Sequence, residues 1–136
     1  MKILFVCTGN TCRSPMAQAI ANDYFAKQNL QHTADSCGLF AQDNDVASEN
    51  AILALKDFEI DLSAHRSKPI TNALVDTADV IIPMTQSHKQ VLLSAGVSPL
   101  KIEMLGEIPD PFGADLQTYR ECAETLKKAI KEKWKL

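Results

Sequence analysis

Short apolar runs alternate along this chain with longer stretches in which apolar residues recur every three or four positions. KILFV at 2–6 and DVIIPM at 79–84 are almost continuously apolar. Such runs are typical of strands that are buried on both faces of a parallel sheet. HTADSCG at 32–38 and KIEML at 101–105 predict two further strands.

Helical spacing of apolar residues predicts the segments between and after these strands. We expect Ser14 to cap the first helix, Pro15 to fall in its first turn, and Gly96 to end the fourth helix. The predicted helices cover residues 15–25, 47–58, 70–78, 87–96 and 114–136. Alternating strands and helices predict the α/β class: one three-layer domain, residues 1–136, whose short parallel sheet is flanked by helices.

The first strand runs directly into the loop CTGNTCRSP at 7–15, which precedes a helix. Loop N–H groups can converge on one anion there, and the helix N-terminus adds partial positive charge. We expect Gly9 to permit close backbone approach, and Arg13 adds a planar, bidentate donor. The loop therefore predicts a cradle for a dianion such as phosphate, although it lacks the Gly-Lys-Ser/Thr ending of a nucleotide-binding P-loop.

Cys7 at the base of this loop indicates that the loop can react with a bound phosphate group as well as bind it. The field that holds phosphate also stabilises a thiolate, which can attack phosphorus while Arg13 and the loop amides stabilise the equatorial oxygens. Ser14 is expected to hydrogen-bond to the Cys7 sulfur. An isolated cysteine at a strand end is usually a core residue. The combination with Gly9, Arg13 and Ser14 favours a nucleophile instead.

Residues 7–15 resemble the signature of the low-molecular-weight protein-tyrosine phosphatase family. The resemblance extends to SCG at 36–38, AHRSKPI at 64–70, MTQSHK at 84–89 and IPDPFG at 108–113. It implies a phosphate loop after the first strand and a phosphocysteine intermediate. It also implies that Asp110, in the late Asp-Pro pair, is the general acid and then the general base. The implied substrate-binding residues are Thr8, Gly9, Asn10, Thr11, Cys12, Ser14 and Phe112.

Thr11 together with DPFG most resembles the protein-arginine phosphatase branch, because tyrosine-specific members tend to carry a bulky aliphatic residue at the Thr11 position. The resemblance therefore implies a phosphatase for phosphoarginine in proteins, with a tyrosine phosphatase as the alternative. An arsenate reductase of this type would need a further pair of redox cysteines, and residues 62–104 contain no cysteine. A phosphate-binding module without catalysis would need neither Cys7 nor Asp110.

The resemblance also assigns supporting roles. Asn10 is expected to brace the loop, with Ser36 and His65 as its partners. From its place five residues after Cys7 in the same loop, Cys12 is either a core cysteine or the partner of Cys7 in a reversible disulfide that protects the nucleophile from over-oxidation. Cys37 and Cys122 are expected in the core.

Composition and charge restrict the partners and the cellular location that we expect for this protein. A net charge of -3 over 136 residues argues against nucleic acid or an anionic membrane as partner. No apolar run approaches the ~18–20 residues of a membrane span, and the N-terminal apolar run is too short for a signal peptide. Four cysteines without a dense framework indicate a reducing compartment, so we expect a cytoplasmic location. We expect a monomer that acts on phosphorylated proteins, without a metal or other cofactor.

Overall fold

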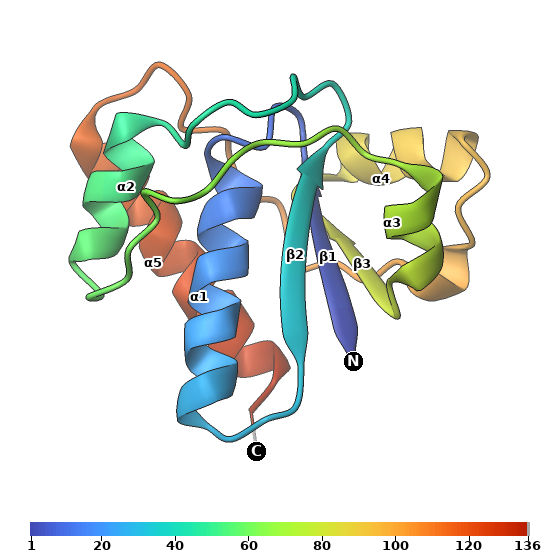
Figure 1. Cartoon of the computed structure of the whole chain (residues 1–136), viewed down its shortest axis with the longest axis horizontal. Coiled ribbons are helices and arrows are strands. Elements are labelled where there is room, and N and C mark those ends of the chain that lie inside the picture. Colours follow the sequence, from blue (N-terminus) through green and yellow to red (C-terminus); the bar gives the residue numbers. More distant parts are fainter. Residues whose placement is uncertain (136) are drawn as a thin grey trace.

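A computed structural model describes residues 1–135 and has three layers, with helices on both faces of a central sheet (Figure 1). Leu136, the last residue of the predicted final helix, lies outside the described residues. The elements are β1 (Lys2–Cys7), α1 (Arg13–Lys27), β2 (Thr33–Gly38), α2 (Glu49–Lys56), α3 (Asn72–Thr77), β3 (Val80–Pro83), α4 (Gln86–Ser94), a 3₁₀ turn (Pro99–Lys101) and α5 (Leu116–Lys133). The predicted fold class is confirmed.

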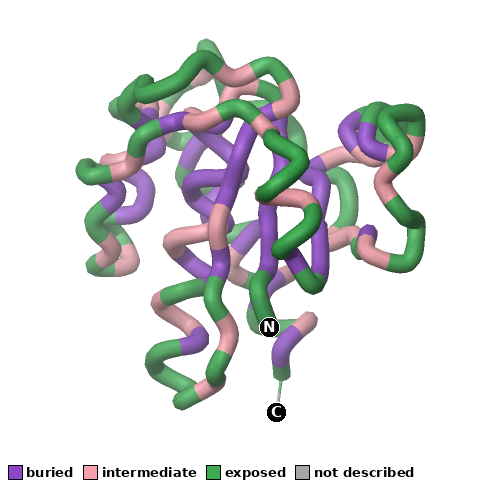
Figure 2. Tube along the Cα trace, turned by 45° about the vertical axis from the view of Figure 1, so that its right-hand side comes forward, coloured by how far each residue is buried: buried purple, intermediate pink, exposed green. Residues whose placement is uncertain are grey.

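The sheet is parallel, with strand order β2-β1-β3. Every residue of β1 after Lys2 is buried, and Figure 2 shows the strands as the buried centre of the molecule. Because successive side chains of a strand point to opposite faces, Ile3 and Phe5 pack in the core beneath α1 and α5, whereas Leu4 and Val6 pack toward α3 and α4. This burial on both faces explains the continuous apolar run at the start of the chain.

The long C-terminal helix is amphipathic, as its apolar spacing predicts. Tyr119, Cys122, Leu126 and Ile130 are buried, and they join the core on the α1 side of the sheet. This packing fixes the segment that precedes α5 against the carboxyl end of the sheet. No helix among residues 1–135 is long and apolar enough to cross a membrane.

The strand predicted at 101–105 is wrong. Residues 99–101 form a 3₁₀ turn, and only Ile102 makes an isolated parallel bridge, opposite Ile81 of β3. Pairing stops there because the chain leaves the edge of β3 and crosses to the carboxyl end of the sheet. The Ile108 N–H then donates to the Met84 carbonyl at 2.9 Å. A short apolar run alone does not distinguish such a crossing from a strand.

The predicted cap of the first helix is also wrong. Helix α1 begins at Arg13 with Cys12 at its N-cap position, so Ser14 lies inside the first turn with Pro15. The Ser14 hydroxyl is used elsewhere, 2.8 Å from the Cys7 sulfur. Gly96 does follow the end of α4, with a φ of 91° that suits glycine.

Candidate active site

A cavity of about 230 Å³ opens at the carboxyl end of β1, where the chain turns into α1. This is the edge at which parallel sheets place ligand sites. It is lined by Cys7, Thr8, Gly9, Asn10, Thr11, Cys12, Arg13, Asp110 and Phe112. Sequence analysis predicted all nine of these residues as site residues. The tenth predicted site residue, Ser14, does not line the cavity but contacts the Cys7 sulfur. The fold thus brings a late segment of the chain onto the first loop.

Cys7 is 3% exposed, and two groups hold its sulfur in place. The Ser14 Oγ lies 2.8 Å from Cys7 Sγ, and the Asn10 backbone N–H donates to the same sulfur at 3.3 Å. Both contacts are donors available to a thiolate, and the N-terminus of α1 adds its partial positive charge. These contacts fix the position of the Cys7 sulfur at the base of the loop.

Arg13 is the cation of the cavity and is 5% exposed. Its Nη1 donates to the Ile108 carbonyl at 3.0 Å, and its Nη2 lies 3.5 Å from Asp110 Oδ2. These contacts fix the plane of the guanidinium and leave donors for an anion in the cavity. The Asp110 side chain is half exposed, and its Oδ1 accepts from the Phe112 N–H at 3.0 Å. Asp110 thus faces both Arg13 and solvent, while the Phe112 ring stands 75% exposed at the mouth.

Asn10 braces the loop from a fully buried position, with a φ of 56° in the left-handed region. Its Nδ2 donates to Ser14 Oγ at 2.8 Å and to Ser36 Oγ at 2.9 Å, and its Oδ1 accepts from the Lys68 N–H at 3.0 Å. His65 Nε2 donates to the Asn10 carbonyl at 2.8 Å. Asparagine tolerates this backbone conformation better than most residues, and these bonds hold it there. The predicted contacts of Asn10 with Ser36 and His65 are confirmed.

Two parts of the backbone pack closely at Gly38, the last residue of β2. A Cβ on Gly9 would meet nothing nearer than Thr11 Oγ1 at 3.9 Å, whereas a Cβ on Gly38 would lie 2.5 Å from the Thr8 carbonyl. The last residue of β2 therefore has to be glycine so that the phosphate loop can pack over it. The contact joins two strand ends that are distant in sequence, and the approach of the Gly9 backbone to a bound anion stays a prediction.

The cysteines divide into two groups, and all four are free thiols. Cys7 and Cys12 line the cavity, and Cys12 Sγ lies 3.3 Å from both Ser48 Oγ and Tyr119 Oη. A Cys7–Cys12 disulfide stays a prediction. Cys37 and Cys122 are buried as expected, and burial raises the pKa of each thiol to about 12.

Sequence reasoning gave no role to His88, which the fold brings beside the loop. The ring of this α4 residue is 7% exposed and contacts Thr8, although the two residues are far apart in sequence. The only local sign of its role is that His88 follows Thr85, the N-cap residue of α4, by three positions. This spacing does not indicate that His88 contacts Thr8. Tyr119 and the Ile108 carbonyl are further neighbours that only the fold supplies.

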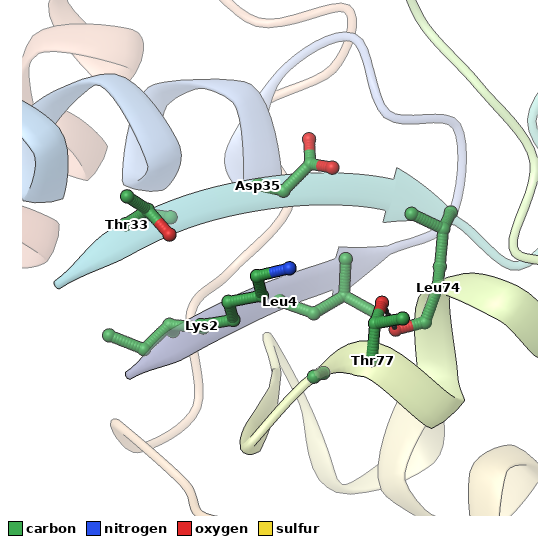
Figure 3. A pocket seen from close by; sticks show the side chains of 9 residues that line it. Lys2, Leu4, Thr33, Asp35, Leu74 and Thr77 are labelled. Carbon is green, nitrogen blue, oxygen red and sulfur yellow. Dashed lines mark hydrogen bonds between the residues drawn. The ribbon is translucent and has the colours of Figure 1, made fainter.

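A second hollow, of about 320 Å³, lies at the opposite end of the sheet (Figure 3). Leu74 and Thr77 of α3 border it together with Lys2 and Leu4 of β1. It holds no nucleophile or convergent set of donors comparable with the first cavity. Within residues 1–135 there is also no group of three or more His, Cys, Asp or Glu side chains that could hold a metal ion.

A cysteine at the base of a strand-to-helix anion cradle, with an arginine and an aspartate beside it, defines the class of cysteine-dependent phosphatases. Residues 2–135 match the family described as Low molecular weight phosphotyrosine protein phosphatase. The chain belongs to this family, as its signature predicts.

Its relatives include both arginine and tyrosine phosphatases. Protein-arginine-phosphatase of Bacillus subtilis (strain 168) is 36% identical, and the match covers 97% of this chain and 93% of that protein. Low molecular weight protein-tyrosine-phosphatase PtpB of Staphylococcus haemolyticus is also 36% identical, over 93% of this chain and 92% of that protein. A solved YwlE arginine phosphatase, a cysteine-to-serine mutant with a phosphorylated active-site serine, has a TM-score of 0.93 and 35% identity, over 97% of this chain and 92% of that one. Overall identity therefore does not separate the two substrates.

The brace around Asn10 leads to a prediction about pH. Burial lowers the pKa of His65 from its ordinary value of 6.5, and the bond to the Asn10 carbonyl opposes this only in part. Below pH 6.5 the unfolded chain therefore binds more protons than the folded one, so stability falls as the pH drops through this region. We expect the free energy of unfolding, measured with urea, to fall less between about pH 7 and pH 5.5 in His65→Gln than in the wild type. An equal loss in both proteins would contradict the role of His65; burial lowers the pKa of His88 as well, so some pH dependence should remain.

Proposed function

We propose that this protein hydrolyses phosphoarginine in proteins through a phosphocysteine intermediate. The observation that carries the choice of phosphoarginine is Thr11, a small hydroxyl residue on the wall of the catalytic cavity. The nucleophile, phosphate clamp and proton donor that we assign are Cys7, Arg13 and Asp110. The phosphorylated serine in the related arginine phosphatase supports a covalent intermediate at the equivalent side chain.

In the first step, the Cys7 thiolate attacks phosphorus. The S–P bond forms as the P–N bond of phosphoarginine breaks, while Arg13 and the loop N–H groups hold the equatorial oxygens. Asp110, entering as the carboxylic acid, gives its proton to the departing guanidine nitrogen. Arginine leaves, and the phosphoryl group remains on the sulfur.

In the second step, Asp110 as carboxylate takes a proton from water, and the water oxygen attacks phosphorus. The O–P bond forms, the S–P bond breaks and inorganic phosphate is released. The cysteine leaves as a thiolate, which the Ser14 hydroxyl at 2.8 Å and the Asn10 N–H at 3.3 Å stabilise. The same two contacts thus serve the nucleophile and the leaving group.

The mouth of the cavity suits a polar, flexible guanidinium better than a phenol ring. Thr11 is small and offers a hydroxyl, and Gly113 follows Phe112 at a position where tyrosine-specific relatives often carry a second aromatic residue. Asp110 is half exposed, so the carbonyl oxygen of its carboxylic acid can also accept a hydrogen bond from the substrate guanidinium. A bulky aliphatic residue at position 11 would remove the polar partner that the Thr11 hydroxyl offers to the guanidinium nitrogens.

A tyrosine phosphatase is the second candidate, because the PtpB relative is as similar as the arginine phosphatase. Arsenate reduction has less support. The two cysteines outside the cavity are buried, and burial raises the pKa of both Cys37 and Cys122 to about 12, which disfavours their reactive thiolate forms.

Replacing Thr11 with isoleucine should weaken phosphoarginine hydrolysis and improve phosphotyrosine hydrolysis in relative terms. Because a buried polar group without a partner costs ~1–3 kcal/mol, the ratio of the two kcat/KM values should change by about 10–100-fold. The measurement is kcat/KM on a phosphoarginine peptide and a phosphotyrosine peptide of otherwise identical sequence.

Thr11→Val is the matched control, because it removes the hydroxyl at nearly constant size. A shift in this variant as well would assign selectivity to the hydroxyl, and a shift in Thr11→Ile alone would assign it to bulk. If Thr11→Ile lowered both rates alike, residue 11 would only support the loop and the argument for phosphoarginine would fail. The assignment as a phosphatase would stand.

A further inference from the structure

His88 is a buried, polar residue that the proposed chemistry does not use. It lies in the first turn of α4, it is 7% exposed, and both of its ring nitrogens have partners. Nδ1 lies 2.9 Å from Thr85 Oγ1, and Nε2 lies 2.8 Å from Thr8 Oγ1. The imidazole thus joins the N-cap of α4 to the first residue of the phosphate loop after Cys7.

The imidazole is neutral at neutral pH. Burial lowers the pKa of His88 first, and the positive charge of Arg13 lowers it further, while Asp110 and Glu107 act in the opposite direction. A neutral ring has one N–H donor and one acceptor. The ring therefore donates to one of the two threonines and accepts from the other.

The surroundings indicate which nitrogen carries the proton. Thr85 Oγ1 already accepts the His88 backbone N–H at 3.2 Å, and Thr85 is half-buried, so its own proton is best paired with Nδ1. Nε2–H then donates to Thr8 Oγ1. The hydroxyl proton that remains free belongs to Thr8, which is exposed and lines the catalytic cavity. In the opposite tautomer the free proton would lie on the less accessible Thr85.

We propose that His88 is a positioning residue, which orients the Thr8 hydroxyl so that its proton is donated to an oxygen of the bound phosphoryl group. With Nδ1 held by Thr85, the ring stays fixed. Because Nε2–H donates to Thr8 Oγ1, the Thr8 proton is free to be donated to the ligand. The inference rests on the proposed function only in that the cavity binds a phosphoryl group. It is independent of the choice between arginine and tyrosine.

Two amide replacements separate this role from simple packing. The side-chain amide of glutamine reaches the position of Nε2 and can still donate to Thr8, whereas the asparagine amide reaches only the position of Nδ1. We expect His88→Asn to lower kcat/KM for an aryl phosphate about 3–10-fold, the range for one hydrogen bond, and to raise the inhibition constant of inorganic phosphate similarly. His88→Gln should recover most of both losses.

A double-mutant cycle tests whether His88 acts through Thr8. Thr8→Val alone should weaken phosphate inhibition about 10-fold, because a hydrogen bond to a charged group is lost. Adding His88→Asn to Thr8→Val should cost little more, since the group that His88 positions is already gone. Thermal unfolding of each variant identifies losses that come from stability alone.

Equal losses for His88→Asn and His88→Gln would overturn the proposal, as would additive losses in the cycle. If the wild type turned over no phosphate ester, the proposed function would fail. The phosphate affinities, measured by calorimetry, would still decide the role of His88.

Discussion

Replacing Cys7 with serine is expected to abolish turnover. A serine hydroxyl is a far weaker nucleophile than a thiolate at neutral pH, and the contacts with Ser14 and Asn10 cannot make up the difference. The measurement is release of inorganic phosphate from a phosphoarginine peptide and from an aryl phosphate. Cys122→Ala is the matched control, because it removes a buried thiol outside the cavity and should preserve activity. Full activity of Cys7→Ser would exclude the phosphocysteine route.

Alkylation provides a second measurement of the same prediction. Iodoacetamide should modify Cys7 rapidly near neutral pH, and inorganic phosphate should protect it. Cys37 and Cys122 should stay unmodified in the folded protein, since burial raises the pKa of each thiol to about 12. Peptide mapping by mass spectrometry assigns the modified residue. Alkylation of Cys7 that needed alkaline conditions, as an ordinary thiol does, would contradict its activation.

Replacing Asp110 with asparagine should slow catalysis by roughly 10²–10⁴-fold, the usual range for a positioned general acid and base. The amide can accept a hydrogen bond from Arg13, but its N–H protons are not acidic enough to be transferred to the leaving group. The loss should therefore be large for phosphoarginine and smaller for aryl phosphates with good leaving groups, which depart without protonation. The measurement is single-turnover kinetics over a series of leaving groups.

Asp115→Asn is the matched control for this experiment. It makes the same change five residues further along, at the N-cap of α5, where asparagine caps as well as aspartate. It should leave both stability and turnover nearly unchanged. An Asp110→Asn loss of the same size for good and poor leaving groups would show that Asp110 is not the proton donor.

The sequence by itself determined the features that depend on neighbouring residues. The apolar run of β1, the loop from Cys7 to Arg13 and the start of a helix are consecutive, so the strand and the helix start follow from local pattern, and the proposal of an anion cradle with a nucleophile rests on the same residues. The late Asp-Pro pair at Asp110 could be assigned only through the family resemblance. Its distance from the loop along the chain gives no geometric information.

The tertiary structure decided the features that depend on residues far apart. The strand expected at 101–105 does not form, because the chain lies beside β3 only at Ile102 and then crosses to the carboxyl end of the sheet. The Ser14 hydroxyl is taken by Cys7 rather than used as a helix cap, and the crowding that requires glycine lies at Gly38. His88 reaches Thr8 only because α4 and β1 end at the same edge of the sheet. Hydrogen bonds and close contacts of this kind depend on packing in three dimensions, so the spacing of apolar residues along the chain does not predict them.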